Sequence, residues 1–241
     1  MKIYSRGLSL VEMAIGLAIV GMLLAMTLAG TQLMAAAELR SMSSQVQSFQ
    51  VAIDNFRDNY GFLPGDYDNA TSVWGTYNAV SAPDGTTNGD GDGQIEYPTS
   101  SEAESLRAWQ QLSLSSYLKG SYSGVAVGAN NQADIGINVP SSKRKAVGFY
   151  LFYGDLATVE TRNEIRLGAF RSSSANSNAA LTPKDAKNID LKTDDGNPTA
   201  GNIYAIKGTD IVSETCQSGG SDYNITLSSK ACILSFALTP Q

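Results

Sequence analysis

Apolar side chains form one continuous run near the N-terminus. Residues 13–37 carry no charged side chain, and residues 13–30 alone provide almost the length with which an α-helix spans a bilayer core, about 20 residues. Two basic residues, Lys2 and Arg6, precede the run. Because basic flanking residues stay on the cytoplasmic side of a membrane, the pattern predicts a membrane-inserted helix whose N-terminus is cytoplasmic.

Beyond this run the apolar positions follow a helical period. They recur in alternating steps of four and three residues, with no proline in between: Ala35, Leu39, Met42, Val46, Phe49, Ile53, Phe56 and Tyr60. This spacing places them on one stripe of a helix, which Gly61 and Pro64 would end. One helix over residues 8–60 would be about 80 Å long. We expect the stripe to pack on the protein's own sheet, with a coiled-coil seam as the alternative.

The C-terminal half is a series of short strand-like runs. Runs rich in β-branched and aromatic residues predict four strands, at 146–154, 164–170, 202–208 and 231–238. The segments 119–145 and 172–198 are rich in Gly, Ser and Asn and predict loops and turns, in which 124–128 could form a further strand. We therefore expect an α+β fold, in which an antiparallel sheet covers the amphipathic part of the long helix.

Composition and charge exclude several classes of function. The net charge is −6 and the sequence pI is about 4.7, whereas nucleic-acid binding needs a basic face for phosphates, so no direct nucleic-acid partner is expected. The chain has no histidine, which removes the commonest general base and zinc ligand. We therefore expect that the protein is not an enzyme. In an exported chain the two cysteines, Cys216 and Cys232, predict one disulfide.

Glu12 is the unusual residue of the N-terminal run. An unpaired carboxylate inside a bilayer costs several kcal/mol, so such a residue is usually functional. Three interpretations compete: a secretory signal peptide cut near residues 35–37, a plain signal anchor, and a membrane segment in which the carboxylate has a function of its own. A signal peptide gains nothing from the carboxylate.

The residues around Glu12 resemble the signature of type IV pilins and of type II secretion pseudopilins. The resemblance covers about 25 residues: a short basic leader that ends in Gly7, a hydrophobic first mature residue, Leu8, and Glu12 as the fifth. It implies that a prepilin peptidase in the membrane cuts the Gly7–Leu8 bond and methylates the new amine. The pattern departs from many members at Ala29, where they carry proline.

The resemblance also implies a role for Glu12. A buried carboxylate is tolerated where it meets a cation, and the freed α-amine of a neighbouring subunit would supply one and set the register between subunits. The expected organisation is a leader at 1–7, a transmembrane and assembly half of the helix at 8–37, and an amphipathic half at 38–60. An acidic insertion at 61–120 and a pilin-like β-sheet head at 121–241 follow.

The acidic insertion predicts a cation site. No Lys or Arg occurs from Asp58 to Leu106, a stretch with nine carboxylates that repel one another. Within it, the segment 88–95 follows the first eight positions of an EF-hand calcium loop, including the required glycine at Gly93. Position 12 is Thr99 instead of Glu. Oxygen ligands without His or Cys select a hard cation such as Ca²⁺; a solvated turn is the alternative.

The expected ligands come from the loop and from the helix after it. The segment 100–117 predicts an amphipathic helix capped by Ser100 or Ser101. Glu96, Glu102 or Glu104 could supply the carboxylate ligand that position 12 lacks. Glu104 is preferred because it lies in the first turn of that helix. The predicted set is Asn88, Asp90, Asp92, the backbone carbonyl of Gln94, Glu96 and Glu104.

These patterns together predict a structural subunit of a type IV pilus-like filament. It would sit in the bacterial inner membrane among lipids, be polymerised with other pilins by an inner-membrane assembly platform, and end in an extracellular or periplasmic filament. A type II secretion pseudopilin is the closest alternative, favoured by the calcium-like loop. A membrane-anchored binding module or adhesin is the alternative from another class.

Overall fold

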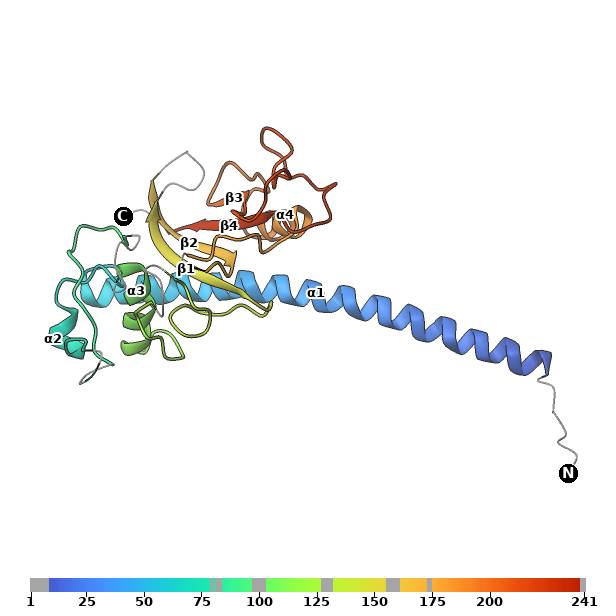
Figure 1. Cartoon of the computed structure of the whole chain (residues 1–241), viewed down its shortest axis with the longest axis horizontal. Coiled ribbons are helices and arrows are strands. Elements are labelled where there is room, and N and C mark those ends of the chain that lie inside the picture. The colour runs from blue at the N-terminus through green and yellow to red at the C-terminus, as the bar shows by residue number, and fades with distance from the viewer. Residues whose placement is uncertain are drawn as a thin grey trace, which may run out of the picture. The chain divides into compact units, whose positions relative to one another are not determined.

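The computed structural model describes residues 9–78, 80, 84–96, 103–126, 132–154, 161–172 and 175–238. Its fold is α+β, with a long N-terminal helix and a C-terminal antiparallel sheet (Figure 1), as predicted. In chain order the elements are α1 (Leu10–Tyr60), α2 (Ala70–Trp74), α3 (Glu104–Leu114), β1 (Val147–Gly154), β2 (Arg162–Ala169), α4 (Pro183–Thr193), β3 (Ile203–Lys207) and β4 (Cys232–Ala237).

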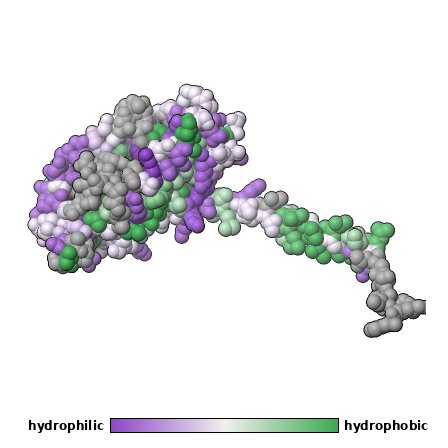
Figure 2. Space-filling view, in the orientation of Figure 1, coloured by the Kyte–Doolittle hydropathy of each residue, from purple (hydrophilic) through white to green (hydrophobic). Residues whose placement is uncertain are grey.

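The contacts divide the chain into two units, Met1–Arg40 and Ser41–Gln241, and α1 contributes to both. In the first unit the large apolar side chains of α1 are exposed, from Leu10 (88%) to Met34 (69%). Figure 2 shows these hydrophobic side chains gathered along the N-terminal part of the helix. Among the described residues, α1 is the one helix long and apolar enough to cross a membrane.

In the second unit the C-terminal part of α1 forms one wall of the core. Met42, Val46, Ile53 and Phe56 are buried along the predicted stripe. Phe49 completes it and makes edge-to-face contacts at 5.0 Å between ring centroids with Trp109 of α3 and with Phe149 of β1. Burial of each such side chain contributes about 1.5–3 kcal/mol. From Met42 to Phe56 the stripe therefore packs in the head, with Phe49 against the sheet, as predicted, whereas Ala35 at the N-terminal end of the predicted stripe is exposed.

The helix ends where the sequence predicts. Gly61 adopts a left-handed conformation (φ +80°) and its N–H donates to the carbonyl of Arg57 at 2.8 Å. This is the arrangement in which glycine terminates helices.

The sheet has four antiparallel strands in the order β1-β2-β4-β3. All four predicted strands are present, with ends that shift by one or two residues. The register places Phe149, Leu167, Leu234 and Ala205 side by side across the sheet. Because paired residues point to the same face, these buried side chains form a continuous apolar layer on the face that meets Phe49.

Three predictions about local structure were wrong or only partly right. The segment 172–198 contains helix α4, whereas we expected turns. Its first turn is set by Thr182, whose side chain accepts from the N–H of Asp185 (3.1 Å), and by Pro183 at the first helical positions. The predicted helix at 100–117 is present as α3, but its N-cap is Ala103 without a side-chain cap bond. Ser100 and Ser101 lie outside the described residues. The further strand at 124–128 is not formed by residues 124–126, which are the part of it that the structure describes.

Candidate functional site

The N-terminal carboxylate has a local role at the start of α1. The backbone N–H of Ser9 donates to Glu12 Oε2 (2.8 Å), and the Ser9 hydroxyl accepts from the N–H of Val11 (3.2 Å). This reciprocal pair resembles a capping box, in which two otherwise free N–H groups of the first helical turn are satisfied. Gly7 and Leu8, the predicted cleavage residues, lie outside the described residues.

The acidic loop folds around a carboxylate that the predicted ligand set did not contain. Asp66, in the turn after α1, is 1% exposed. Its Oδ1 accepts from the N–H groups of Gly91 (2.7 Å) and Asp92 (3.1 Å), and its Oδ2 accepts from the N–H of Gly93 (3.0 Å). The loop thus presents three consecutive backbone N–H groups to one buried carboxylate.

Two glycines allow this approach of loop and turn. A Cβ on Gly89 would lie 2.4 Å from the backbone of Asp66, so only glycine fits there. Gly93 has φ +87°, which disfavours other residues, but its Cβ position is open. The alternating glycines of the loop therefore serve its packing on the turn after α1, in addition to any ligand geometry.

Glu104 holds the other side of the loop from the first turn of α3. Its Oε1 accepts from the N–H of Asp90 and its Oε2 from the N–H of Glu96, both at 3.2 Å. The carboxylates form two overlapping clusters that share Asp90. Within each cluster the oxygen atoms lie within 4.8 Å of one another: Asp66, Asp90 and Asp92 in one, and Asp90, Glu96 and Glu104 in the other.

Burial and like charge raise the pKa of two of these carboxylates, Asp66 and Glu104. Burial raises the pKa of Asp66 to about 6, against the hydrogen bonds from Gly93 and Gly91, and the charges of Asp92 and Asp90 add to the rise. Burial also raises the pKa of Glu104, and Glu96 adds to that rise. Either a proton or a bound cation relieves such a cluster.

The structure brings four of the six predicted ligands into these clusters: Asp90, Asp92, Glu96 and Glu104. Asn88 uses its Oδ1 to accept from the N–H of Thr71 (2.8 Å), and the side chain of Gln94 donates to Asp92 (2.6 Å). Thr99 and Glu102 lie outside the described residues. Sequence spacing alone could not reveal Asp66, because it joins the loop through a tertiary contact.

The set of oxygen donors fits a hard cation. Five carboxylates from three separate segments converge on one loop: Asp66, Asp90, Asp92, Glu96 and Glu104. Ca²⁺ takes six to eight oxygen ligands in flexible geometry, and such a set selects it over zinc. The same contacts also have a purely structural use, because the carboxylate of Asp66 organises the loop through its backbone N–H groups.

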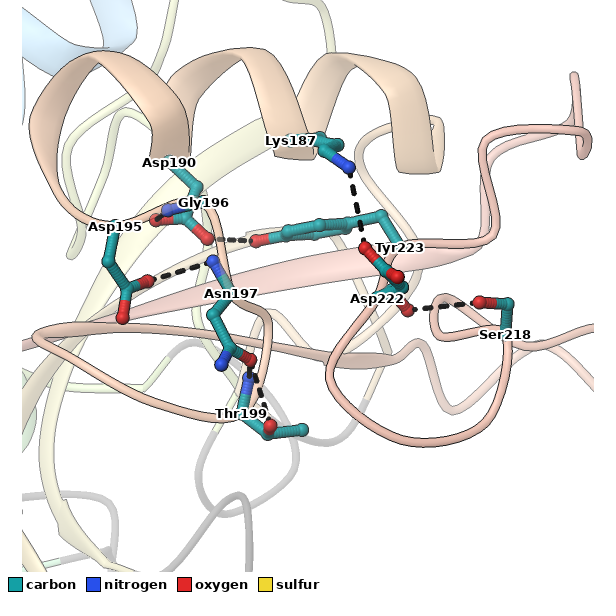
Figure 3. Close-up of polar contacts among 9 residues, drawn as sticks. All are labelled: Lys187, Asp190, Asp195, Gly196, Asn197, Thr199, Ser218, Asp222 and Tyr223. Carbon is teal, nitrogen blue, oxygen red and sulfur yellow. Dashed lines mark hydrogen bonds and ion pairs between the residues drawn. The ribbon is translucent and has the colours of Figure 1, made fainter.

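A second acidic cluster lies between α4 and the disulfide loop (Figure 3). Asp190 is fully buried; its Oδ2 accepts from the hydroxyl of Tyr223 (2.7 Å) and its Oδ1 from the N–H of Gly196 (3.1 Å). Asp194 and Asp195 lie beside it. Burial raises the pKa of Asp190 to about 6, against these two hydrogen bonds.

Tyr223 belongs to the loop that the predicted disulfide closes. The bond between Cys216 and Cys232 is present, which confirms the prediction. The side chain of Tyr223 is buried against Asp190, and Lys187 of α4 pairs with Asp222 at 3.5 Å (Figure 3). The cluster therefore fastens the disulfide loop to α4.

Comparisons with known proteins add no relative: the chain matches no protein-family model, no curated protein and no solved structure. The N-terminal residues, the long helix and the acidic loop are therefore the observations from which a function can be argued.

Proposed function

We propose that the protein is a structural subunit of a type IV pilus-like filament. The observation that carries the proposal is the division of α1. Its N-terminal part exposes apolar side chains all round, while farther along the helix Met42, Val46, Phe49, Ile53 and Phe56 are buried in the head. A membrane anchor needs about 20 apolar residues. In a filament subunit the same residues would serve a second time, as the surface through which the subunits polymerise.

The residues from Gly7 to Glu12 support this assignment through their resemblance to the pilin signature. The prepilin would enter the inner membrane with its N-terminus in the cytoplasm and be cleaved between Gly7 and Leu8. The carboxylate of Glu12 would then pair with the methylated amine of a neighbouring subunit. Its Oε2 already accepts from Ser9, and its Oε1 would receive the amine.

N-terminal sequencing and intact mass of the protein purified from membranes test the proposal. We expect a mature chain that starts at a methylated Leu8. A start near Glu38 would identify a secretory signal peptide, and an uncut chain would identify a plain anchor; either result overturns the filament assignment.

The closest alternative is a type II secretion pseudopilin, which shares the same anchor and polymerisation surface. The acidic loop favours it, because the resemblance associates a calcium-like loop after the long helix with pseudopilins. Deletion of the gene separates the two: loss of protein secretion supports the pseudopilin, and loss of surface filaments with normal secretion supports the pilus.

We further propose that the acidic loop binds Ca²⁺ through the carboxylates of Asp66, Asp90, Asp92, Glu96 and Glu104. The clustering of these groups and the absence of Lys and Arg between Asp58 and Leu106 support the assignment. Extracellular calcium would compensate the repulsion and hold the loop between the turn after α1 and the start of α3.

Thermal unfolding of the full chain in dodecyl maltoside, with Ca²⁺ or with EGTA, tests calcium binding. We expect Ca²⁺ to raise the Tm of the unaltered chain, and Asp66→Asn and Glu104→Gln to remove most of that rise, because each keeps an oxygen acceptor for the loop but loses the charge. Asp222→Asn, which alters an exposed carboxylate on the disulfide loop, is the matched control. An equal Tm in Ca²⁺ and EGTA would leave the loop as a structural turn.

A further inference from the structure

The head carries a patch of basic side chains, although the chain as a whole is acidic. The chain contains 23 acidic and 17 basic residues, yet its segments 135–154 and 165–184 contain basic residues and no acidic one. Five basic residues from the turn before β1, the end of β2 and the start of α4 make up what we name the basic patch: Lys143, Arg144, Lys145, Arg171 and Lys184. They belong to neither of the two acidic clusters.

Tertiary contacts bring the turn before β1 to the start of α4. Residues 142–147 form this turn, and a backbone hydrogen bond of 2.9 Å joins its ends. From the turn, the guanidinium of Arg144 donates to the carbonyl of Ala180 (3.3 Å) and pairs with Asp185 (3.4 Å). Lys184 precedes Asp185 in the first turn of α4 and is exposed. Helix α4 therefore begins beside the turn.

The end of β2 lies against the same turn. The N–H of Phe170 donates to the carbonyl of Ala146 at 2.9 Å. Arg171, which follows Phe170, is exposed, as are Lys143 and Lys145 of the turn. The turn and the end of β2 thus combine exposed cations with the partly exposed ring of Phe170 (38%), and such a combination is typical of surfaces that contact membranes.

The basic patch keeps a net positive charge. Asp185 is the acidic partner of Arg144, whereas the guanidinium of Arg171 donates to a neutral serine hydroxyl at 3.3 Å. One further carboxylate, that of Asp210, reaches this region and accepts from a backbone N–H at 2.8 Å. In the described part of the chain, no ion pair involves the lysines of the patch: Lys143, Lys145 and Lys184.

The basic patch lies at the end of the head where α1 enters it. The side chain of Gln45 donates to the carbonyl of Ser141 (3.1 Å), the residue before the turn. The acidic loop, by contrast, packs on the turn that follows the C-terminal end of α1, where α2 lies (Figure 1). Charges of opposite sign therefore occupy opposite ends of the part of α1 that the head buries. An anionic surface would attract one end of the head and repel the other.

Helix α1 connects this end of the head to the apolar segment. Met34 of the apolar segment and Gln45 of the head belong to this one helix. About 16 Å of helix separates the two positions, which is about two Debye lengths at physiological ionic strength. Insertion of the apolar segment therefore keeps the basic patch near one leaflet, whatever the angle between the head and the membrane. Such a contact needs little affinity, because the tether makes binding intramolecular.

We propose that the basic patch binds anionic lipid headgroups of the leaflet from which the head emerges, and so orients the head on the membrane. Ammonium and guanidinium groups bind lipid phosphates through charge-assisted hydrogen bonds, and each lysine or arginine near an anionic surface adds to the attraction. The inference rests on the membrane insertion of α1 in the proposed function, but not on cleavage or polymerisation.

Acetylation of lysine side chains by uncharged N-hydroxysuccinimidyl acetate, read residue by residue by mass spectrometry, tests the proposal. The full chain is placed in nanodiscs of phosphatidylcholine alone or of phosphatidylcholine with phosphatidylglycerol. We expect Lys143 and Lys145 to react at least about threefold more slowly in the anionic discs, because a surface potential of about −30 mV lowers the fraction of unprotonated amine by this factor. Lys119, an exposed lysine after α3, is the internal control and should react equally in both discs.

Variants and salt separate the patch from the general field of the disc. Arg171→Gln removes one cation but keeps a hydrogen-bond donor, and it should reduce the difference at Lys143 and Lys145, as should high salt. Lys119→Gln is the matched control and should leave this difference unchanged. The Tm of each variant checks that it is folded.

Three results would overturn the lipid contact. Equal rates at Lys143 and Lys145 in the two discs, or an equal slowing at Lys119, overturn this inference alone. Slow acetylation in both discs that depends on protein concentration would instead assign the basic patch to the acidic loop of a second copy. A chain that does not co-elute with either disc overturns the membrane anchor of the proposed function together with the lipid contact.

Discussion

Substitution of Glu12 by glutamine and by alanine separates the two roles that this residue combines. The carboxylate accepts from the N–H of Ser9 at 2.8 Å and so caps α1. Under the proposed function it also pairs with the amine of a neighbouring subunit. Glutamine keeps an oxygen acceptor and is compatible with a capping box, but it carries no charge. Alanine removes both the cap and the charge.

The two roles differ in free energy. Loss of a capping interaction costs about 1 kcal/mol, whereas a charge left unpaired at membrane depth costs about 3 kcal/mol. If the ion pair drives register, Glu12→Gln should raise the subunit concentration needed for assembly on the order of 100-fold. Glu12→Ala should be worse by about a further fivefold, which corresponds to the lost cap.

The assay compares sheared filaments with the total cleaved protein in cells that express each variant. Intact mass of the N-terminus confirms that the Gly7–Leu8 bond is cut in both variants, so that a loss of filaments reports assembly. Ser9→Ala is the matched control, because it removes the hydroxyl that accepts from Val11 (3.2 Å) and leaves the charge. Normal filaments from Glu12→Gln would refute the ion-pair reasoning and leave Glu12 as a cap residue.

Three further predictions concern the head. Gly89→Ala should lower the free energy of unfolding by about 1–3 kcal/mol in a denaturant titration, because its Cβ meets backbone at 2.4 Å, and more than Gly93→Ala, whose Cβ position is open; equal losses would contradict this packing. Reduction of Cys216–Cys232 should cost about 3 kcal/mol in the same assay, and an unchanged midpoint would count against it. The raised pKa of Asp190, about 6, means that the folded state binds this proton more tightly than the unfolded state, so stability is gained as the pH falls from about 6 to 4. Asp190→Asn should flatten the dependence of Tm on pH in this window, and an unaltered slope would refute it.

The long helix and the strands could be predicted because their residues repeat at the period of the element. Steps of three and four from Leu39 to Phe56 set the buried stripe of α1, and each strand is a short run of β-branched and aromatic residues. Helix α4 was missed because Ser and Asn precede it and Asp, Gly and Asn follow it, although Thr182, Pro183 and Asp185 are typical signals of a helix start.

The candidate sites divide in the same way. The capping box at Ser9 and Glu12 is readable from a serine followed three residues later by glutamate. The role of Asp66 cannot be predicted from the sequence, because Asp66 contacts the acidic loop only when the turn after α1 packs against Gly89. Sequence spacing locates ligands within one loop, whereas a ligand from a distant segment follows from the tertiary fold.

The two acidic clusters of the head, around Asp190 and around Asp66, have different hydrogen-bond donors and charges near them. For this reason a cation is proposed only at Asp66. Asp190 accepts from neutral donors, Tyr223 and Gly196, and lies on a helix that also carries Lys187 and Lys192. The loop around Asp66 has no basic residue within its own stretch of the chain. Its backbone N–H groups satisfy hydrogen bonds but cannot neutralise five converging carboxylates. Under the proposed function the head would meet calcium outside the cell, and calcium would supply a counterion for the loop. The cluster at α4 already holds the disulfide loop through Tyr223 and through the Lys187–Asp222 pair.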